Sequence, residues 1–134
     1  MKKNKIGLIG YGYWGPNIAR ILDEIDNAEL VYCADLVEKS RQQVKEKFPH
    51  VKTTDNYQDI LNDPEVDAVC VVTPTKSHYK IAKDVLLAKK HLFIEKPLTY
   101  KLEDAKEIDA LAKKLNLTLM VGHLFLFNPA VNYI

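Results

Sequence analysis

This chain of 134 residues has few cysteines and no long uninterrupted apolar run. It holds only two cysteines, Cys33 and Cys70, and both fall within apolar runs that are typical of central strands. We therefore expect buried, reduced thiols rather than a disulfide, a metal site or a nucleophile. No apolar run approaches the roughly 18–20 residues of a membrane span, and the first predicted strand begins too early for a secretory signal. These features together predict a cytoplasmic protein.

The chain also lacks an excess of charge of either sign. Its 19 basic and 18 acidic residues give a formal net charge of +1. Without a basic field or an acidic tail, nucleic acid is not an expected partner, and the basic cluster Lys2, Lys3 and Lys5 is interpreted as a solvated N-terminus. With 47% apolar and 28% charged residues, the composition is that of one globular domain able to bury its own core.

Only five glycines are present, yet three of them, Gly10, Gly12 and Gly15, form a G-x-G-x-x-G motif. The motif directly follows an apolar run and directly precedes a helical pattern. In a dinucleotide site, the first glycine allows the tight turn, the second lets the backbone approach a pyrophosphate, and the third allows close helix packing. Asp35 lies 20 residues after Gly15, where an acceptor for ribose hydroxyls is expected. The N–H groups at the helix start would then face the phosphates.

Two alternatives to a dinucleotide remain at this point. A turn that only packs a strand against a helix explains Gly15 but not the acid at position 35. Another adenosine ligand, such as S-adenosylmethionine, would also use an acid at the end of the second strand. In the dinucleotide interpretation, we expect the residues between the glycines to contribute to the same site: Tyr11, Tyr13 and Trp14.

Apolar runs alternate with helical patterns along the whole chain. Strands are expected at residues 5–10, 29–34, 51–53, 68–73, 92–95 and 117–121. Helices are expected at residues 16–26, 37–48, 57–61, 77–89 and 102–115. This alternation implies parallel pairing with right-handed crossovers. We therefore predict an α/β fold, a doubly wound parallel sheet of about six strands in the order 3-2-1-4-5-6, with helices on both faces.

Three further motifs follow the later predicted strands: Thr73-Pro74-Thr75-x-x-His78-Tyr79, Glu95-Lys96-Pro97, and Gly122-His123 with Asn128-Pro129-Ala130. With the glycine loop, they resemble the nucleotide-binding domain of the glucose–fructose oxidoreductase/inositol dehydrogenase/MocA family. The resemblance implies a Rossmann domain over residues 1–122. It also implies hydride transfer between NAD and a secondary alcohol of a sugar or nucleotide sugar. The glycine loop and the C-terminal motif look like the branch of UDP-N-acetyl-amino-sugar 3-dehydrogenases.

The triplet Glu95, Lys96 and Pro97 is the strongest catalytic signal in the sequence. Lys96 follows a buried strand, so we expect its ammonium to point into the ligand crevice. The resemblance implies that it stabilises the alkoxide formed as hydride leaves; a solvent-facing lysine is the alternative. We expect Glu95 to accept from ribose hydroxyls or to orient Lys96, and Pro97 to hold Lys96 in an extended backbone.

Four other residues are candidates for the cofactor site. Thr73 and Pro74 end a strand beside the crevice, where they would form the floor under the nicotinamide ribose and pyrophosphate. A simple helix-entry turn is the alternative. The resemblance puts His78 near the cofactor, although a surface or capping histidine would serve as well. His123 would touch the nicotinamide or the substrate, or lie in a domain interface.

Asp35 is followed by Leu36 rather than by an arginine. A carboxylate bonds both ribose hydroxyls but repels a 2′-phosphate, so NAD is favoured over NADP. Residues 123–134 are expected to begin the crossover into a C-terminal α/β substrate domain that this chain lacks; a tail folded onto the sheet is the alternative. The apolar residues 124–127 then predict a homo-oligomer such as a dimer, or a reorganised C-terminus.

Without a substrate domain, the chain should bind cofactor with little turnover. One rival function is a nucleotide-sensing module, or a domain completed by a partner chain. A methyltransferase is the other. Neither would need the Glu95-Lys96-Pro97 triplet.

Overall fold

A computed structural model describes residues 2–122 of the chain. The predicted sheet is confirmed: six parallel strands lie in the order β3-β2-β1-β4-β5-β6. The strands are β1 (Asn4–Ile9), β2 (Ala28–Ala34), β3 (Lys52–Thr54), β4 (Ala68–Val71), β5 (His91–Glu95) and β6 (Leu119–Gly122). Each begins and ends within about two residues of its predicted bounds, the usual uncertainty of helix and strand ends. The fold class is therefore the Rossmann doubly wound sheet that the alternating pattern predicts.

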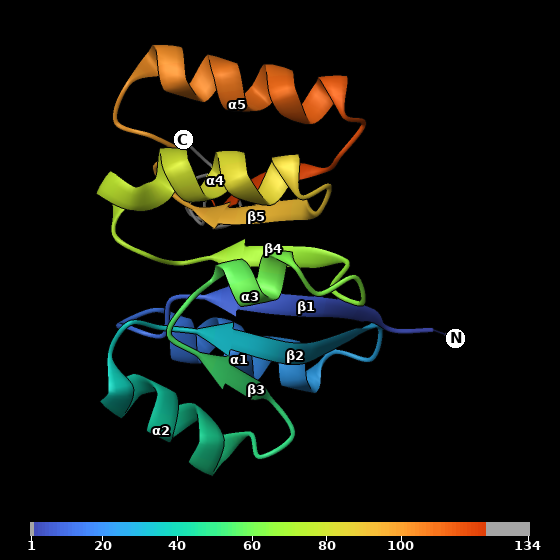
Figure 1. Cartoon of the computed structure of the whole chain (residues 1–134), viewed down its shortest axis with the longest axis vertical. Helices are drawn as coiled ribbons and strands as arrows, with labels where there is room; N and C mark the ends of the chain where they lie inside the picture. Colours follow the sequence, from blue (N-terminus) through green and yellow to red (C-terminus); the bar gives the residue numbers. More distant parts are fainter. Residues whose placement is uncertain (1, 123–134) are drawn as a thin grey trace, which may run out of the picture.

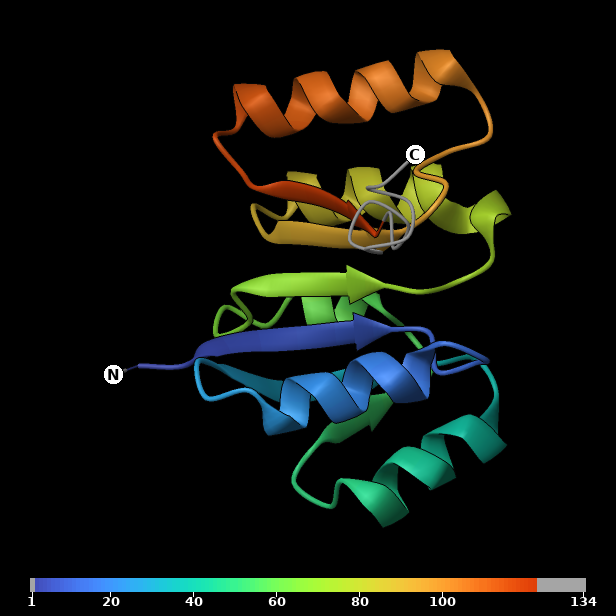
Figure 2. The same ribbon diagram turned by 180° about the vertical axis from the view of Figure 1, so that it is seen from behind.

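Helices connect the strands on both faces of the sheet. They are α1 (Gly15–Glu24), α2 (Glu38–Lys47), α3 (Gln58–Leu61), α4 (His78–Leu87) and α5 (Leu102–Lys114), with a 3₁₀ turn η1 (Thr75–Ser77) before α4. Helices α3 and α4 lie in front of the sheet in Figure 1, whereas α1 lies behind it and comes to the front in Figure 2. Within residues 2–122, no helix is long and apolar enough to cross a membrane.

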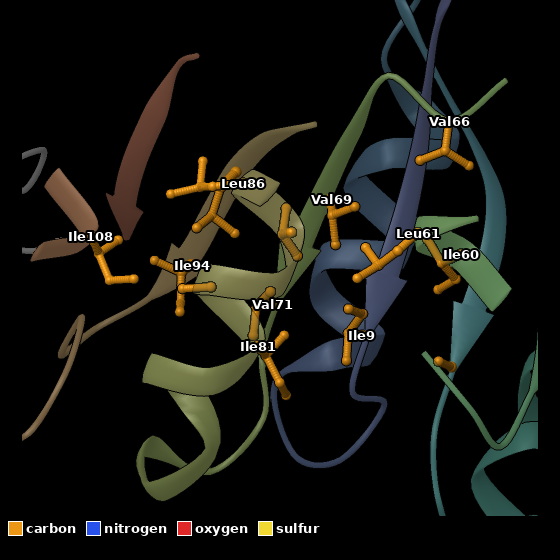
Figure 3. Close-up of a cluster of buried hydrophobic side chains, with 14 of the residues drawn as sticks. Ile9, Ile60, Leu61, Val66, Val69, Val71, Ile81, Leu86, Ile94 and Ile108 are labelled. Carbon is orange, nitrogen blue, oxygen red and sulfur yellow. The ribbon is translucent and has the colours of Figure 1, made fainter. Parts of the chain in front are cut away.

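One core layer fills the face covered by α3 and α4. Figure 3 shows Val71 beside Ile81 of α4 and Ile94 beside Ile108 of α5, in one cluster that also contains Ile9. These side chains are almost fully buried. Each contributes about 1.5–3 kcal/mol relative to an exposed position. Because side chains alternate along a strand, the neighbours of these residues point to the opposite face.

The second core layer lies against α1 and α2 and contains both cysteines. Leu8 of β1 pairs with Cys33 of β2 on one side and with Cys70 of β4 on the other, so a whole strand separates the thiols. Both are buried and unbonded, as expected. Burial, reinforced for Cys33 by the nearby charge of Asp35, raises the pKa of both thiols to about 12. Neither thiol is therefore a nucleophile in the folded chain.

The carboxyl ends of all six strands lie at one edge of the sheet, because the strands are parallel. From β1 the chain proceeds to β2 on one side, whereas β4 lies on the other side of β1. In doubly wound sheets, ligands bind in the crevice beyond such a switch point. The loops after β1, β2, β4 and β5 meet at this edge.

Candidate functional site

A cavity of about 1140 Å³ lies at this edge of the sheet. Its volume exceeds the roughly 300–1,000 Å³ of pockets for drug-sized ligands, which leaves room for a larger molecule. It is lined by residues from the segments that follow β1, β2, β3 and β4 and by the last residue of β5. The predicted site residues among them are Gly10, Gly12, Tyr13, Trp14, Asp35, Thr73, Pro74 and Glu95.

The three glycines of the loop after β1 are required for different reasons. Gly10 has φ = +101°, and a Cβ there would lie 2.8 Å from the carbonyl oxygen of Val72. A Cβ on Gly15 would lie 2.6 Å from the carbonyl oxygen of Gly10, so the start of α1 packs tightly against the exit of β1. A Cβ on Gly12 would meet nothing within 4 Å. Gly12 therefore borders open space in the cavity, and the fold itself does not require glycine there.

Asp35 follows β2 and is held by two neighbouring loops. Its Oδ2 accepts the backbone N–H of Tyr11 at 2.7 Å, and its Oδ1 accepts that of Val37 at 2.8 Å. Arg41 braces the same loop by donating through Nη1 to the carbonyl oxygens of Asp35 and Leu36, at 3.0 and 3.1 Å. A carboxylate oxygen can accept more than one hydrogen bond. The Asp35 carboxylate is therefore fixed in direction and keeps accepting capacity for a diol.

Two polar atoms in the cavity wall are buried and have no hydrogen-bond partner among residues 2–122: Trp14 Nε1 and Glu95 Oε1. One is a donor and the other an acceptor. An unpaired buried polar atom costs about 1–3 kcal/mol. The other oxygen of Glu95 accepts the backbone N–H of Lys96 at 3.3 Å. A ligand that offers one acceptor and one donor would satisfy both orphan atoms.

Thr73 and Pro74 line the cavity after β4. The Ser77 hydroxyl lies 2.7 Å from both Thr73 Oγ1 and the carbonyl oxygen of Pro74, which closes the turn into η1. His78 is only 1% exposed, so the alternative of a surface histidine is wrong. Its ring lies between the loops after β4 and β5 and does not line the cavity.

Other predicted site residues lie away from the cavity lining. The Tyr11 side chain is buried in the second core layer, and burial raises the pKa of its phenol. Only its backbone N–H serves the site, through Asp35. Lys96 and Pro97, which are joined by a cis peptide bond, are exposed and do not line the cavity. His123 lies outside the described residues.

The segments that follow β2, β3 and β4 also supply lining residues that the sequence interpretation missed. Tyr57 donates its hydroxyl hydrogen to Asp84 Oδ2 at 2.5 Å, and Lys80 bonds both partners, at 3.1 and 2.8 Å. Burial, then the hydrogen bond to Asp84, raises the pKa of Tyr57. The missed lining residues include Leu36, Asp55, Asn56, Tyr57, Gln58, Lys76, Ser77 and Lys80. The predicted strand order was the available signal, since it puts the loop after β3 at the same edge.

Residues 4–123 match the family model GFO_IDH_MocA, described as "Oxidoreductase family, NAD-binding Rossmann fold". The chain belongs to this family. It is 36% identical over 118 residues to myo-inositol 2-dehydrogenase of Thermotoga maritima, covering 88% of this chain and 35% of that protein. The apo structure of scyllo-inositol dehydrogenase from Lactobacillus casei superposes with a TM-score of 0.89 at 26% identity, covering 98% of this chain and 40% of that one.

A shorter match reaches an enzyme whose name specifies a nucleotide sugar. UDP-N-acetylglucosamine 3-dehydrogenase of Acidithiobacillus ferrooxidans is 40% identical over 70 residues, 52% of this chain and 22% of that protein. A Bacillus subtilis relative, 29% identical over 89% of this chain, is named scyllo-inositol 2-dehydrogenase (NADP(+)) IolW. Relatives matched over most of this chain therefore include inositol dehydrogenases, and the chain spans about a third of their length.

The residues at the cavity fit a dinucleotide. The open space beside Gly12 admits a phosphate close to the backbone, which a side chain would fill. The fixed carboxylate of Asp35 can accept hydrogen bonds from the hydroxyls of a ribose, and the unpaired oxygen of Glu95 can accept one from another ribose hydroxyl. Within residues 2–122, no group of three or more His, Cys, Asp or Glu side chains is placed to hold a metal ion.

Proposed function

We propose that this cleft binds NAD(H), and that a protein carrying the chain transfers hydride between NAD and a secondary alcohol of a sugar or nucleotide sugar. The observation that carries the cofactor assignment is the doubly anchored carboxylate of Asp35 at the end of β2. A fixed carboxylate accepts from the 2′- and 3′-hydroxyls of NAD, whereas it repels the 2′-phosphate of NADP. We therefore assign NAD as the preferred cofactor.

Each part of the cofactor has proposed partners in the cavity wall. The pyrophosphate would approach Gly12 and the start of α1, whose N–H groups favour negative charge. Thr73 and Pro74 would lie under the nicotinamide ribose. The orphan oxygen of Glu95 would accept a ribose hydroxyl, and Trp14 Nε1 would donate to a cofactor oxygen.

Bound NAD would accept the hydride, and we propose that Lys96 acts on the hydroxyl group of the alcohol. Lys96 would take the proton of the hydroxyl group as hydride passes to NAD, and in the reverse direction its ammonium would stabilise the alkoxide that hydride addition to the ketone forms. Lys96 is exposed in this chain, so the substrate side would have to be closed by further residues. We propose that residues 1–122 form the cofactor domain, that residues 123–134 begin the connection to a substrate domain, and that residues 1–134 alone turn over little substrate.

The proposed substrates are ring compounds that carry secondary alcohols, a class that includes both cyclic polyols and sugars. The inositol dehydrogenases among the relatives support this class. Within it, we propose a nucleotide-linked amino sugar, which the 40% identity to UDP-N-acetylglucosamine 3-dehydrogenase over 70 residues supports. Turnover assays on a longer protein that contains this chain, with inositols and UDP-sugars side by side, would separate the two.

Isothermal titration of residues 1–134 tests the cofactor assignment. NAD should bind more tightly than NADP, and S-adenosylmethionine should not bind. Tighter binding of NADP would refute the role of Asp35, and binding of S-adenosylmethionine in place of NAD would favour a methyltransferase. A blue shift of NADH emission on binding would be an independent readout.

A nucleotide-sensing module remains a second candidate because Lys96 is exposed and does not line the cavity. Such a module would bind NAD equally well but would not need Lys96. Full-length turnover that falls in a Lys96→Ala variant would favour the enzyme. We also propose a homo-oligomer, and a single monomeric species in sedimentation at high concentration would count against it.

A further inference from the structure

His78 is one of the most deeply buried polar side chains in the described part of the chain, with 1% of its surface exposed. It begins α4, between two loops that carry predicted site residues. The first loop follows β4 and contains Thr73, which lines the cavity. The second follows β5 and contains Lys96 and Pro97. The ring therefore lies where the two loops could be joined.

Both ring nitrogens of His78 contact backbone carbonyl oxygens. Nδ1 lies 2.8 Å from the oxygen of Pro97, and Nε2 lies 2.8 Å from the oxygen of Thr73. A carbonyl oxygen accepts hydrogen bonds and cannot donate them. A neutral imidazole has one N–H and one lone pair, so it can serve only one of these oxygens. In either neutral tautomer, a nitrogen lone pair would face an oxygen at 2.8 Å.

We propose that His78 is a positioning residue held as an imidazolium, whose two N–H groups tie the Thr73 loop to the Pro97 loop. The inference deepens the proposed function, because it concerns the loops of the same cofactor cleft. Hydrogen bonds from a charged donor are shorter and stronger than neutral ones, which agrees with both 2.8 Å distances. They also provide part of the stabilisation that a buried charge requires.

The consequence concerns where Lys96 lies relative to the cleft. Both acceptors are main-chain atoms, so the two bonds fix the backbone of the loops rather than one rotamer. Thr73 is in the cleft wall, and Lys96 immediately precedes Pro97. His78 thus sets the separation between the wall beneath the cofactor and the proposed catalytic lysine without touching the ligand itself.

Long-range ¹H–¹⁵N spectra of the ¹⁵N-labelled chain at neutral pH test the charge state. Four histidines contribute signals, and a His78→Gln variant assigns those of position 78. The signals of partly exposed His50, whose Nε2 lies 3.6 Å from Asp23 Oδ1, serve as an internal control for comparison with the buried His78. We expect both nitrogens of His78 to resonate in the protonated range. One nitrogen in the unprotonated range would overturn the imidazolium, and this readout does not depend on NAD.

Cofactor titration tests the positioning role. His78→Phe removes both donors and should weaken NAD binding about tenfold, which is about 1.4 kcal/mol. His78→Gln keeps an amide donor that can reach one carbonyl, so its affinity should be intermediate. A folded His78→Phe that binds NAD like the wild type would overturn the positioning role. If His78→Phe does not fold, the ¹⁵N signals of the His78 ring still test the charge state. The NAD affinity of His78→Gln still tests the positioning role. Wild-type protein that shows the imidazolium signals but binds no NAD would refute only the proposed function.

Discussion

Gly12→Ala should separate cofactor binding from folding. A Cβ at this position meets nothing within 4 Å, so the fold has room for the methyl group. The backbone of Gly12 is not in the positive-φ region, which an L residue would avoid. Replacing glycine at a compatible position restricts the unfolded chain and stabilises a protein by about 0.4–1 kcal/mol. The free energy of unfolding should therefore stay the same or rise by that amount.

The same methyl group points into the space proposed for the pyrophosphate. NAD affinity should fall at least tenfold in Gly12→Ala, which is about 1.4 kcal/mol. Gly12→Val, with a larger side chain, should abolish binding. Calorimetric titration gives the affinity and urea unfolding gives the stability. Trp14, the single tryptophan, lines the cleft and gives a fluorescence signal for both.

Gly10→Ala is the matched control two residues away. Its Cβ would lie 2.8 Å from the carbonyl oxygen and 2.9 Å from the carbonyl carbon of Val72, at φ = +101°. Backbone strain of this kind costs about 1–3 kcal/mol, so this variant should lose stability. The phosphate assignment would be refuted if folded Gly12→Ala bound NAD like the wild type. If Gly12→Ala lost as much stability as Gly10→Ala, the claim that the fold has room for a Cβ at position 12 would be refuted.

Four other predictions concern the cofactor, the core and the chemistry. Asp35→Ser should narrow the gap between NAD and NADP affinities, because the repelling charge is gone; an unchanged ratio in calorimetry would contradict this. Lys90 is 5% exposed and donates at 2.8 Å to two carbonyl oxygens, so Lys90→Met should cost about 1–3 kcal/mol in urea unfolding. Burial lowers the pKa of Lys90 below its ordinary 10.5, so the folded chain loses this proton before the unfolded chain does. The free energy of unfolding of the wild type should therefore increase relative to that of Lys90→Met as the pH rises toward 10.5. Cys33 and Cys70, with pKa values of about 12, should resist alkylation at pH 8 until urea unfolds the chain; rapid labelling of the native chain would contradict this. In an active longer protein, Lys96→Ala should lower kcat by roughly 10²-fold or more, and full activity would remove Lys96 from the mechanism.

Local patterns in the sequence were enough to predict most of the fold and the glycine loop. The period of the apolar residues distinguishes strands from helices, and the alternation of the two implies parallel pairing. The resulting strand order was confirmed. The burial of the cysteines was also predictable, because a central strand covered on both faces buries most of its side chains. These features depend on residues a few positions apart, so one sequence was enough.

Only the tertiary structure decided which loops meet and which side chains face the cleft. The bond from Tyr11 to Asp35 spans 24 residues and that from His78 to Pro97 spans 19, and no local period encodes either contact. In the structure, the Tyr11 side chain lies in the core and Tyr57 lines the cleft. The physical reason is that periodicity fixes which face of an element is apolar, whereas the contacts of a loop depend on how sheet order and helix packing bring distant strand ends together.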